Sequence, residues 1–485
     1  MNKKLDQYSH YLSEEVATSS VILEKEIIAD LTLNSSNVKK NAIFFALKGA
    51  TTHGIKYIDQ AIKSGAIAVV LDSKEKHLVD SESYPMIYID NLKDKIPDIA
   101  CEFYKAKPEK LVGITGTNGK TTSALLMHQA LTFLNKKSSY IGTLSLFQGA
   151  TLNQNCHTTP DIFLLHKMIS ESQGNYIMLE VSSHGIEQGR VSGLDFHTKI
   201  FTNLSQDHLD YHGTMEAYRA IKRSFLISDT QSNLVLDITE ELSKELIKKD
   251  LHNIITFGLD VNAMIMGSIA HQDLEGQLIE VTYQNKSDVI NTKLIGDFNA
   301  KNILSALGGL VSLGEDFNKS CEALSTVKQI EGRTNQFILN KNTRVMVDYA
   351  HTPDALEKVL FSLSRLIRKN KIITVLGCGG ERDKQKRPIM AGIAEYYSNH
   401  VVLTNDNPRK EEPASIIDDM LRGASNKKNF TTILDRADAI DYAIDRAEGG
   451  MILLAGKGHE QFQDLGTEVK HFCDLEYIKG VIAND

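Results

Sequence analysis

Residues 111–122, Leu-Val-Gly-Ile-Thr-Gly-Thr-Asn-Gly-Lys-Thr-Thr, are of the types that bind nucleotide phosphates. An apolar run followed by a Gly/Thr/Asn turn and Lys-Thr-Thr predicts a strand, a phosphate loop and a helix start. In such a loop, backbone N–H groups face the phosphates, Lys120 neutralises the β/γ charge, and the Thr121 hydroxyl joins the Mg²⁺ shell. The usual glycine five residues before Gly119 is replaced by Ile114. The alternative, a Gly-rich turn without a ligand, fits the strand-loop-helix context less well.

Two polar clusters follow later apolar runs. Residues 179–184 end one predicted strand with Glu180, two serines and a histidine, and residues 202–212 end the next with Asp207 and His208 among others. Ligands of parallel sheets collect beyond the carboxyl ends of strands, and Mg²⁺ accepts carboxylates with an occasional imidazole. Each cluster alone is also compatible with a satisfied polar loop. Together with the phosphate loop, they predict a metal and substrate site.

Composition predicts a large enzyme that binds neither nucleic acid nor membranes. The chain has 485 residues, enough for about three domains, and its 54 Lys and Arg against 62 Asp and Glu give a net charge of −8. It shows no basic tail, no signal-peptide pattern at its start and no apolar run of the ~20 residues that a membrane span needs. We therefore expect a cytoplasmic protein, and we expect a monomer.

The cysteines show neither metal-ligand spacing nor an even framework. They are Cys101, Cys156, Cys321, Cys378 and Cys473. We expect reduced, mostly buried thiols, with Cys378 as an exception because it lies in a Gly-rich loop.

The order of predicted elements indicates an α/β fold. Up to about residue 105, strands at 42–47 and 66–71 flank a helix at 57–64, which predicts a small α/β domain. Further on, short buried strands alternate with helices, which favours a mostly parallel sheet; these strands are at 139–143, 176–181, 199–203, 233–237 and 254–257. Beyond residue 333 a second doubly wound unit is predicted, with strands at 345–349, 372–376, 401–404 and 451–455 and helices at 354–367, 388–397, 414–421 and 437–447.

A series of motifs occurs in a fixed order along the chain, at residues 116–122, 180–184, 207–213, 296–302, 347–354, 377–384, 406–409 and 455–460. This ordered set resembles the Mur ligase family, closest to the MurE type, which adds the third amino acid to UDP-N-acetylmuramoyl-L-alanyl-D-glutamate in peptidoglycan synthesis. The resemblance runs from about residue 30 to the end of the chain.

The resemblance implies three domains. They are an N-terminal UDP-sugar-binding domain over residues 1–107, a central ATP-binding P-loop domain over 108–332, and a C-terminal Rossmann-like domain for the incoming amino acid over 333–485. It also implies a mechanism: ATP phosphorylates the substrate carboxylate, the amino group attacks the acyl phosphate, and a tetrahedral intermediate collapses to amide, ADP and phosphate. The protein contributes positioning and charge neutralisation.

The resemblance also implies roles for individual residues. Lys120, Lys222, His208 and Glu180 are the expected catalytic residues. The Mg²⁺ ligands would be Thr121, Glu180, His208 and a carbamylated Lys222, whose added CO₂ turns a cation into an anionic oxygen ligand; without the family, Lys222 would be an ordinary solvated lysine. The expected ATP-binding residues are Gly116, Thr117, Asn118, Gly119, Lys120, Thr121, Thr122, Asn299, Asn302, Arg333 and Asp348. Those for the UDP-muramoyl dipeptide are Ser35, Thr158, Thr159, Ser182, Gln188 and Arg190. His351 and Lys386 stay outside the set.

Residues 405–413 bear on which amino acid is added. In the resembled family, arginine at the fourth position of Asp-Asn-Pro-Arg accompanies enzymes that add meso-diaminopimelate, whereas relatives that add L-lysine usually lack it. Diaminopimelate has a second carboxylate that the Arg409 guanidinium can bind in a bidentate manner. The alternative for Arg409 is an ion pair with Glu411 or Glu412. The other expected contacts of the amino acid are Arg382, Asp406, Asn407, Gly456 and Glu460, the last suited to the distal ammonium.

Two segments depart from the family pattern. Asn34-Ser35-Ser36 stands where the family usually has Asp-Ser-Arg, so only Ser35 carries over to the uridine contacts. At residues 236–239 only Asp237 matches. Two rival functions remain open: a related ligase that extends folate with glutamate, and a P-loop switch protein. A switch would hydrolyse ATP without a carboxylate substrate, so an assay with both substrates separates these hypotheses.

Overall fold

The computed structural model describes residues 27–484 except 50–51, 81–82, 145, 148–149, 152–156, 173, 250–252, 340–342, 369–370 and 448, so Cys156 lies outside the described residues. The chain divides into two compact units. One contains Met1–Glu109, Ile141–Ile177 and His184–Asp195, and the other contains Lys110–Tyr140, Met178–Ser183 and Phe196–Asp485.

The first unit contains a parallel sheet in the order β1-β2-β3-β4. Its strands are β1 Asp30–Thr32, β2 Ala42–Phe45, β3 Ala66–Asp72 and β4 Met86–Ile89. Its helices are α2 Ile58–Lys63, α3 Leu92–Tyr104 and α5 Ile162–Glu171. Alternate strand residues pack on α2 and on α3 with α5, so the sheet is covered on both faces and its strands are almost continuously apolar. The predicted small α/β domain is confirmed.

The larger unit begins with a sheet in the order β15-β14-β13-β12-β11-β10-β5-β9-β6. Its strands are β5 Lys110–Thr115, β6 Ser138–Ile141, β9 Tyr176–Glu180, β10 Thr198–Phe201, β11 Asn233–Asp237, β12 Ile254–Leu259, β13 Ile265–Asp273, β14 Gly276–Tyr283 and β15 Lys286–Thr292. The pairs from β5 through β10, β11 and β12 to β13 are parallel, as expected.

The structure contains an antiparallel extension, β13-β14-β15, that the sequence did not predict. These strands alternate buried with exposed side chains, because only one face meets the core. A search for short buried apolar runs therefore overlooks them.

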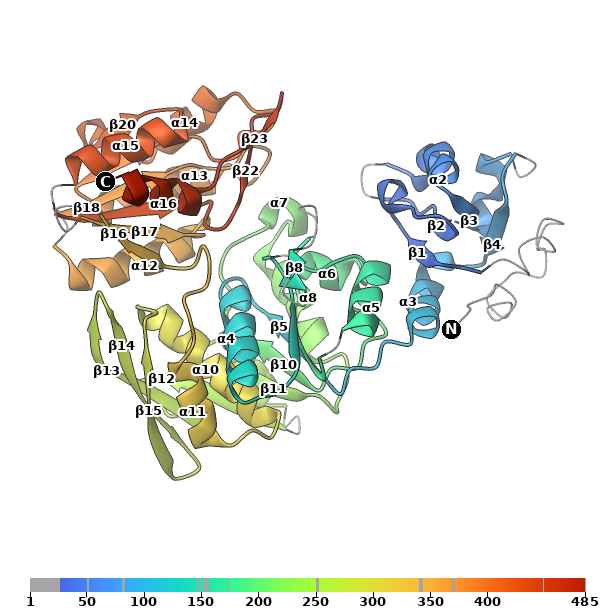
Figure 1. Cartoon of the computed structure of the whole chain (residues 1–485), viewed down its shortest axis with the longest axis horizontal. Coiled ribbons are helices and arrows are strands. Elements are labelled where there is room, and N and C mark those ends of the chain that lie inside the picture. The colour runs from blue at the N-terminus through green and yellow to red at the C-terminus, as the bar shows by residue number, and fades with distance from the viewer. Residues whose placement is uncertain are drawn as a thin grey trace. The chain divides into compact units, whose positions relative to one another are not determined.

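Helices accompany this sheet, and the last of them packs against its antiparallel end at β15. They are α4 Lys120–Phe133, α7 Leu209–His212, α8 Met215–Leu226, α9 Glu241–Ile247, α10 Asp297–Ser312 and α11 Phe317–Ser325. The apolar helix α10 packs against α4 and against β11 and β12 (Figure 1). This packing holds α4, the helix after the phosphate loop, against the sheet that contains β5, the strand before the loop.

The third sheet has the order β16-β17-β21-β18-β19-β20, and only the β16–β17 pair is antiparallel among its described strands. Its strands are β16 Asn335–Ile338, β17 Arg344–Asp348, β18 Ile372–Leu376, β19 His400–Leu403, β20 Phe430–Thr432 and β21 Met451–Ala455. Its helices are α12 Pro353–Leu366, α13 Lys386–Tyr397, α14 Pro413–Leu421, α15 Arg436–Arg446 and α16 Asp474–Asn484. A short hairpin joins β22 Phe462–Asp464 and β23 Val469–His471.

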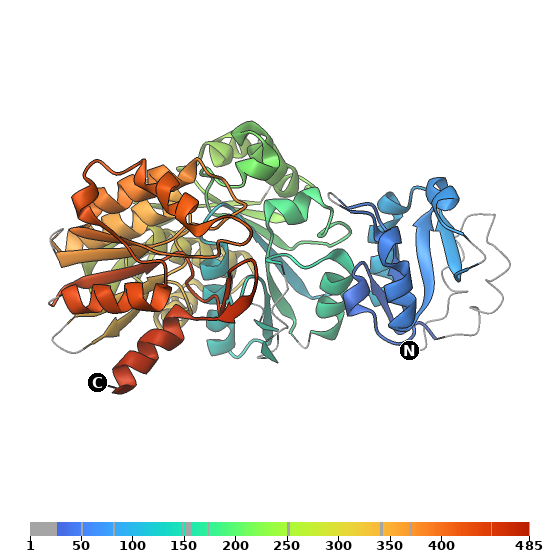
Figure 2. The same ribbon diagram turned by 90° about the horizontal axis from the view of Figure 1, so that it is seen from above.

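This sheet is doubly wound, as predicted. One core places α12, α13 and α14 on one face, and a second core places α15 and α16 on the other (Figure 2). Strand residues such as Met346 and Val347 alternate between the two cores. Both faces of the sheet are thus apolar, and polar side chains lie at the ends of its strands.

The cysteines among the described residues are free. The expectation that Cys378 is an exception is wrong: it is 4% exposed, and burial raises the pKa of its thiol to about 12. Its loop folds back onto the core through apolar contacts that the glycines on either side do not reveal.

Candidate active site

The phosphate loop joins the end of β5 to the start of α4. Gly116 and Gly119 adopt positive φ angles of 151° and 88°. A Cβ atom on Gly116 would lie 1.9 Å from Thr202 Oγ1, and one on Gly119 would lie 2.3 Å from Asn302 Oδ1. Both positions therefore require glycine, and the loop backbone stays close to β10 and α10.

Lys120 and Thr121 occupy the first turn of α4. The Lys120 ammonium donates to the carbonyls of Gly116 at 2.9 Å and Thr117 at 2.8 Å, so it curls back over the loop. Burial lowers the pKa of Lys120, while the carboxylates of Glu180 and Asp207 oppose that shift. The Thr121 hydroxyl donates to Glu180 Oε2 at 2.9 Å, and Tyr140 donates to the other oxygen of this carboxylate.

Lys222 on α8 is not a solvated lysine. Its side chain is 1% exposed, and its ammonium donates to the Gly116 carbonyl at 2.9 Å and lies 4.6 Å from the Tyr218 ring. Burial, reinforced by the charge of Lys120, places the pKa of Lys222 well below its ordinary value. The amines of Lys120 and Lys222 therefore share one carbonyl of the phosphate loop.

Asp207 and His208 follow β10. His208 has a left-handed backbone with φ of 55°, and its Nε2 lies 3.3 Å from Asp207 Oδ2. Burial by itself raises the pKa of Asp207, but His208, His351 and Lys386 outweigh it and lower the pKa below the usual value. This carboxylate is therefore charged and surrounded by cationic or imidazole groups, including two residues outside the predicted set.

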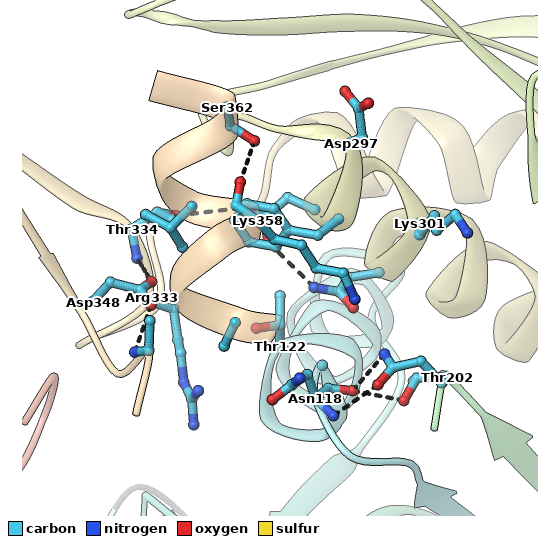
Figure 3. A pocket seen from close by; sticks show the side chains of 18 of the residues that line it. Asn118, Thr122, Thr202, Asp297, Lys301, Arg333, Thr334, Asp348, Lys358 and Ser362 are labelled. Atoms are coloured by element: carbon cyan, nitrogen blue, oxygen red, sulfur yellow. Dashed lines mark hydrogen bonds between the residues drawn. The ribbon is translucent and has the colours of Figure 1, made fainter. Parts of the chain in front are cut away.

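A cavity of ≈ 320 Å³ adjoins the phosphate loop in the larger unit. Figure 3 shows side chains from the loop, α10, α12 and the end of β17 around it. Most of the residues expected to bind ATP line it: Asn118, Gly119, Thr122, Asn299, Asn302, Arg333 and Asp348. The structure thus brings together residues that are more than 200 positions apart in the sequence.

Arg333 connects this cavity to the loop. Its guanidinium donates to Thr121 Oγ1 at 3.1 Å and stacks 4.6 Å from the centre of the Tyr349 ring. Asp348 accepts from the backbone N–H groups of Thr334 and Ala350 at 2.7 and 2.8 Å. Burial raises its pKa, against the opposing effect of Arg333.

Sequence reasoning missed several polar residues that line the cavity or contact the phosphate loop beside it. Lys301 lies 3.0 Å from Asp237, the residue with only a partial family match. Asp354 Oδ2 accepts from Asn118 of the phosphate loop at 2.8 Å and from Lys358 at 2.8 Å. Lys301 and Asp354 lie inside the ordered motifs, so their positions could have identified them as site residues. Lys358 lies outside every motif, and no feature of the sequence marks it.

Most residues expected to hold the amino acid gather at the carboxyl end of the third sheet. Asn407 donates to Glu460 Oε2 at 2.8 Å, and a Cβ on Gly456 would lie 2.8 Å from Asp406 Oδ2. Lys457 lies 3.2 Å from the same Glu460 oxygen. Burial and the negative charge of Asp406 raise the pKa of Glu460.

Arg409 does not form the predicted alternative ion pair. Its Nη1 donates to the Gly380 carbonyl at 2.7 Å, while Glu411 pairs with Arg387 at 2.8 Å. Arg382 and Arg409 both lie close to Gly379, since a Cβ on this glycine would be 3.0 Å from Arg409 Nη1 and 3.7 Å from Arg382 Cγ. The Arg382 Nη1 donates to the Glu381 carbonyl at 3.2 Å.

In the first unit, Arg190 connects two of the residues expected to bind the UDP-muramoyl dipeptide. It donates to the Thr159 carbonyl and to the Gln188 side chain, both at 2.6 Å. The Thr158 hydroxyl accepts from Thr143 at 3.2 Å.

Of the other two expected residues, Ser35 is distant from this group in the sequence, whereas Ser182 stands between Thr159 and Gln188. Ser35 donates to Gln60 at 3.0 Å, and the divergent Asn34 accepts from the Ser36 N–H at 2.9 Å, which caps the short turn. Ser182 belongs to the larger unit.

Among the described helices, none is long and apolar enough to cross a membrane.

Three family models match successive parts of the chain. The Mur ligase family catalytic domain matches residues 28–104, the Mur ligase middle domain matches 114–310, and the Mur ligase glutamate ligase domain matches 332–458. Two curated relatives are named UDP-N-acetylmuramoyl-L-alanyl-D-glutamate--2,6-diaminopimelate ligase. The one from Fusobacterium nucleatum is 38% identical over 95% of this chain and 97% of its own, and the one from Bacillus cereus is 36% identical over 95% of each.

Solved structures agree with these matches. A structure of a ligase with the same name is 29% identical, with a TM-score of 0.65 over 100% of this chain and 99% of its own. MurF from Acinetobacter baumannii has a TM-score of 0.72 over 100% of this chain and 99% of its own, at 14% identity, which establishes a shared fold.

Proposed function

The chain belongs to the Mur ligase family, and from that membership we propose that it joins meso-diaminopimelate to UDP-N-acetylmuramoyl-L-alanyl-D-glutamate at the expense of ATP. One observation carries the proposal: a single unit holds a phosphate loop whose Gly116 carbonyl accepts from two lysines and, at the next sheet, a group of guanidinium and carboxylate side chains held by hydrogen bonds. This arrangement suits the activation of a carboxylate and the binding of an amino acid that has two charged ends. The reaction belongs to the synthesis of peptidoglycan precursors, and thus to cell wall biogenesis.

Activation is needed because a carboxylate is a poor electrophile. Transfer of the γ-phosphoryl group gives an acyl phosphate and ADP, and attack by the amino group of the incoming amino acid then releases phosphate and leaves an amide. Lys120 would neutralise charge on the transferring phosphoryl group, and the loop N–H groups would hold the β-phosphate. Arg333, bonded to Thr121 and stacked on Tyr349, would add a second fixed positive charge.

The donor set fits Mg²⁺ once Lys222 carries a carbamate. Thr121, Glu180, His208 and the carbamylated Lys222 would hold the ion, which supplies charge neutralisation at the phosphates when bound. The supporting observation is the buried amine of Lys222, because burial lowers its pKa and so favours the neutral amine, the form that adds CO₂. Without the modification, Lys120 and Lys222 lie 2.9 Å from one carbonyl oxygen, and in their charged forms they would repel a cation.

The residues expected to bind the amino acid favour diaminopimelate over lysine as the substrate. Arg409 and Arg382 offer guanidinium donors for a distal carboxylate, and Glu460 offers a carboxylate for the distal ammonium. Lysine lacks that carboxylate and would leave the arginines unpaired. The same reaction with L-lysine is therefore the less favoured alternative.

We assign one ligand to each domain. Residues 1–107 would bind the UDP-sugar, residues 108–332 would bind ATP, and residues 333–485 would bind the amino acid. Ser35, Thr158, Thr159, Ser182, Gln188 and Arg190 would contact the UDP-muramoyl dipeptide. We also propose that the protein acts as a cytoplasmic monomer.

A phosphate-release assay tests the proposal. The protein is supplied with ATP, Mg²⁺ and the UDP-muramoyl dipeptide, and meso-diaminopimelate is compared with L-lysine. We expect phosphate release only when the dipeptide and diaminopimelate are both present. Release with ATP alone would indicate a switch-like ATPase, and release that depends on a folate and glutamate would indicate the folate ligase.

A further inference from the structure

Two loops at the carboxyl end of the third sheet carry four of the six expected amino-acid contacts, and they lie directly against each other. Residues 377–384 form one loop and residues 404–412 form the other. The Gly380 N–H donates to the Asn407 carbonyl at 2.9 Å, and the Glu381 N–H donates to Glu411 Oε1 at 3.0 Å. A Cβ on Gly380 would lie 1.9 Å from the Pro408 carbonyl oxygen, so no space separates the loops.

Arg387 on α13 lies beneath both loops. Its side chain is 0% exposed, and its guanidinium donates to Glu411 Oε2 at 2.8 Å, to Asp419 Oδ2 at 2.8 Å and to the Gly379 carbonyl at 3.2 Å. One side chain thus binds the backbone of the first loop and the carboxylate of the second. Glu411 completes the connection, because its other oxygen accepts from the first loop.

Burying the charged Arg387 side chain at this position costs folding free energy, which argues for a specific role. Arg387 is the second residue of α13, where the positive end of the helix dipole opposes a cation. Its Nε is buried and has no hydrogen-bond partner. A buried charge of this kind persists only if its carboxylate partners are present, and removal of one leaves the other charge uncompensated.

Arg409 depends on the geometry that this pair sets. Its backbone has a left-handed φ of 52°, its N–H donates to the Asp464 carbonyl at 3.1 Å, and its guanidinium donates to the Gly380 carbonyl. Gly380 lies between Gly379, which accepts from Arg387, and Glu381, which donates to Glu411. A shift of the first loop would therefore move the anchor of the Arg409 guanidinium.

We propose that Arg387 and Glu411 are positioning residues that hold the two loops together and so orient Arg409 toward the distal carboxylate of diaminopimelate. The inference rests on the proposed function. Neither residue is expected to touch a substrate.

Kinetics of the full-length enzyme test this role. Glu411→Gln keeps the shape of the side chain and removes its charge, and Arg387→Lys keeps the charge and removes the planar fork. For both variants we expect the KM for meso-diaminopimelate to rise about 10-fold or more, since hydrogen bonds to charged groups are lost, while the KM for ATP stays unchanged. The preference for diaminopimelate over L-lysine should fall with the same variants.

Two control variants separate positioning from general destabilisation. Glu412→Gln changes the exposed neighbour of Glu411 and should leave every constant unchanged. Asp419→Asn removes the other carboxylate of Arg387, and the ion pairs of Asp419 are with Arg387 and Arg422, which lie outside both loops. It should lower the melting temperature and leave the KM for diaminopimelate close to the wild-type value. If Glu411→Gln does not fold, Glu411→Asp, which is one methylene shorter, carries the same comparison.

The outcomes are distinguishable. A wild-type enzyme that does not ligate diaminopimelate refutes the proposed function itself. An active wild type with an unchanged KM and unchanged lysine discrimination in Glu411→Gln and Arg387→Lys refutes only the positioning role. Equal KM increases in Asp419→Asn and Glu411→Gln would also overturn it, because the pair would then act through stability alone.

Discussion

The phosphate loop and the amino-acid loops are built in different ways. The first is a contiguous segment whose glycines, lysine and threonine are adjacent in the sequence, and its shape is dictated by positive φ angles at Gly116 and Gly119. The second is assembled from three separate loops that charged side chains connect, among them the buried Arg387 and Glu411. A local motif thus shapes the phosphate loop, whereas the amino-acid loops depend on long-range packing.

The largest effect is expected at the phosphate loop. Lys120→Ala deletes the charge that meets the transferring phosphoryl group, so we expect turnover to fall by about 10²- to 10³-fold or more. The melting temperature should change little, since the Lys120 ammonium is bonded to backbone carbonyls rather than to the apolar core. Phosphate release and thermal unfolding measure these quantities, with exposed Lys137→Ala as control. Near-normal turnover would refute the phosphate-loop assignment.

Lys222→Ala tests the proposed carbamate. We expect severe loss of activity and partial rescue by acetate, whose carboxylate can occupy the vacated space near the loop. Lys248→Ala, which changes an exposed lysine, serves as control. Intact-mass measurements on the native enzyme should show added CO₂. An active enzyme with only unmodified Lys222 would contradict the hypothesis.

Arg409→Ala should affect selection more than chemistry. Loss of a desolvated charge contact costs about 2 to 5 kcal/mol of transition-state binding. The kcat/KM for meso-diaminopimelate should fall by the factor that corresponds to this free energy. Trace activity with L-lysine should not fall equally. The wild type should discriminate by about 10⁴. The comparison is made at saturating ATP and dipeptide, with Lys410→Ala as control. Unchanged preference would show that Arg409 is structural.

The smallest effect concerns the acid stability of the amino-acid loops. The hydrogen bond from Arg387 holds the pKa of Glu411 at about 2, below the ordinary value of about 4.3. A depressed pKa stabilises the fold fully above the unfolded-state value, and this contribution disappears as the pH falls toward 2. The difference in unfolding free energy between wild type and Glu411→Gln should therefore be constant above pH about 5 and shrink below pH about 4. Denaturant titrations at several pH values measure it, and a difference that does not vary with pH would argue against the ion pair.

The sequence by itself determined the features that are local. Apolar runs located the parallel strands, the ordered motifs indicated the family, and Gly116-Thr-Asn-Gly-Lys-Thr identified the phosphate loop. These succeed because strand burial and loop conformation depend on neighbouring residues. The same reasoning failed at β13–β15, where one-sided burial hides the strands, and at Cys378, whose burial depends on distant helices.

Only the tertiary structure decided how the charged groups are paired. The sequence offered Glu411 as a partner for Arg409, but packing of α13 beneath the loops gives that carboxylate to Arg387 and leaves Arg409 on a backbone carbonyl. Likewise, nothing near Lys222 in the sequence predicts its burial, which follows from the packing of α8 against the phosphate loop. Charge pairing and desolvation depend on distances in space, and sequence spacing does not encode those distances across separate elements.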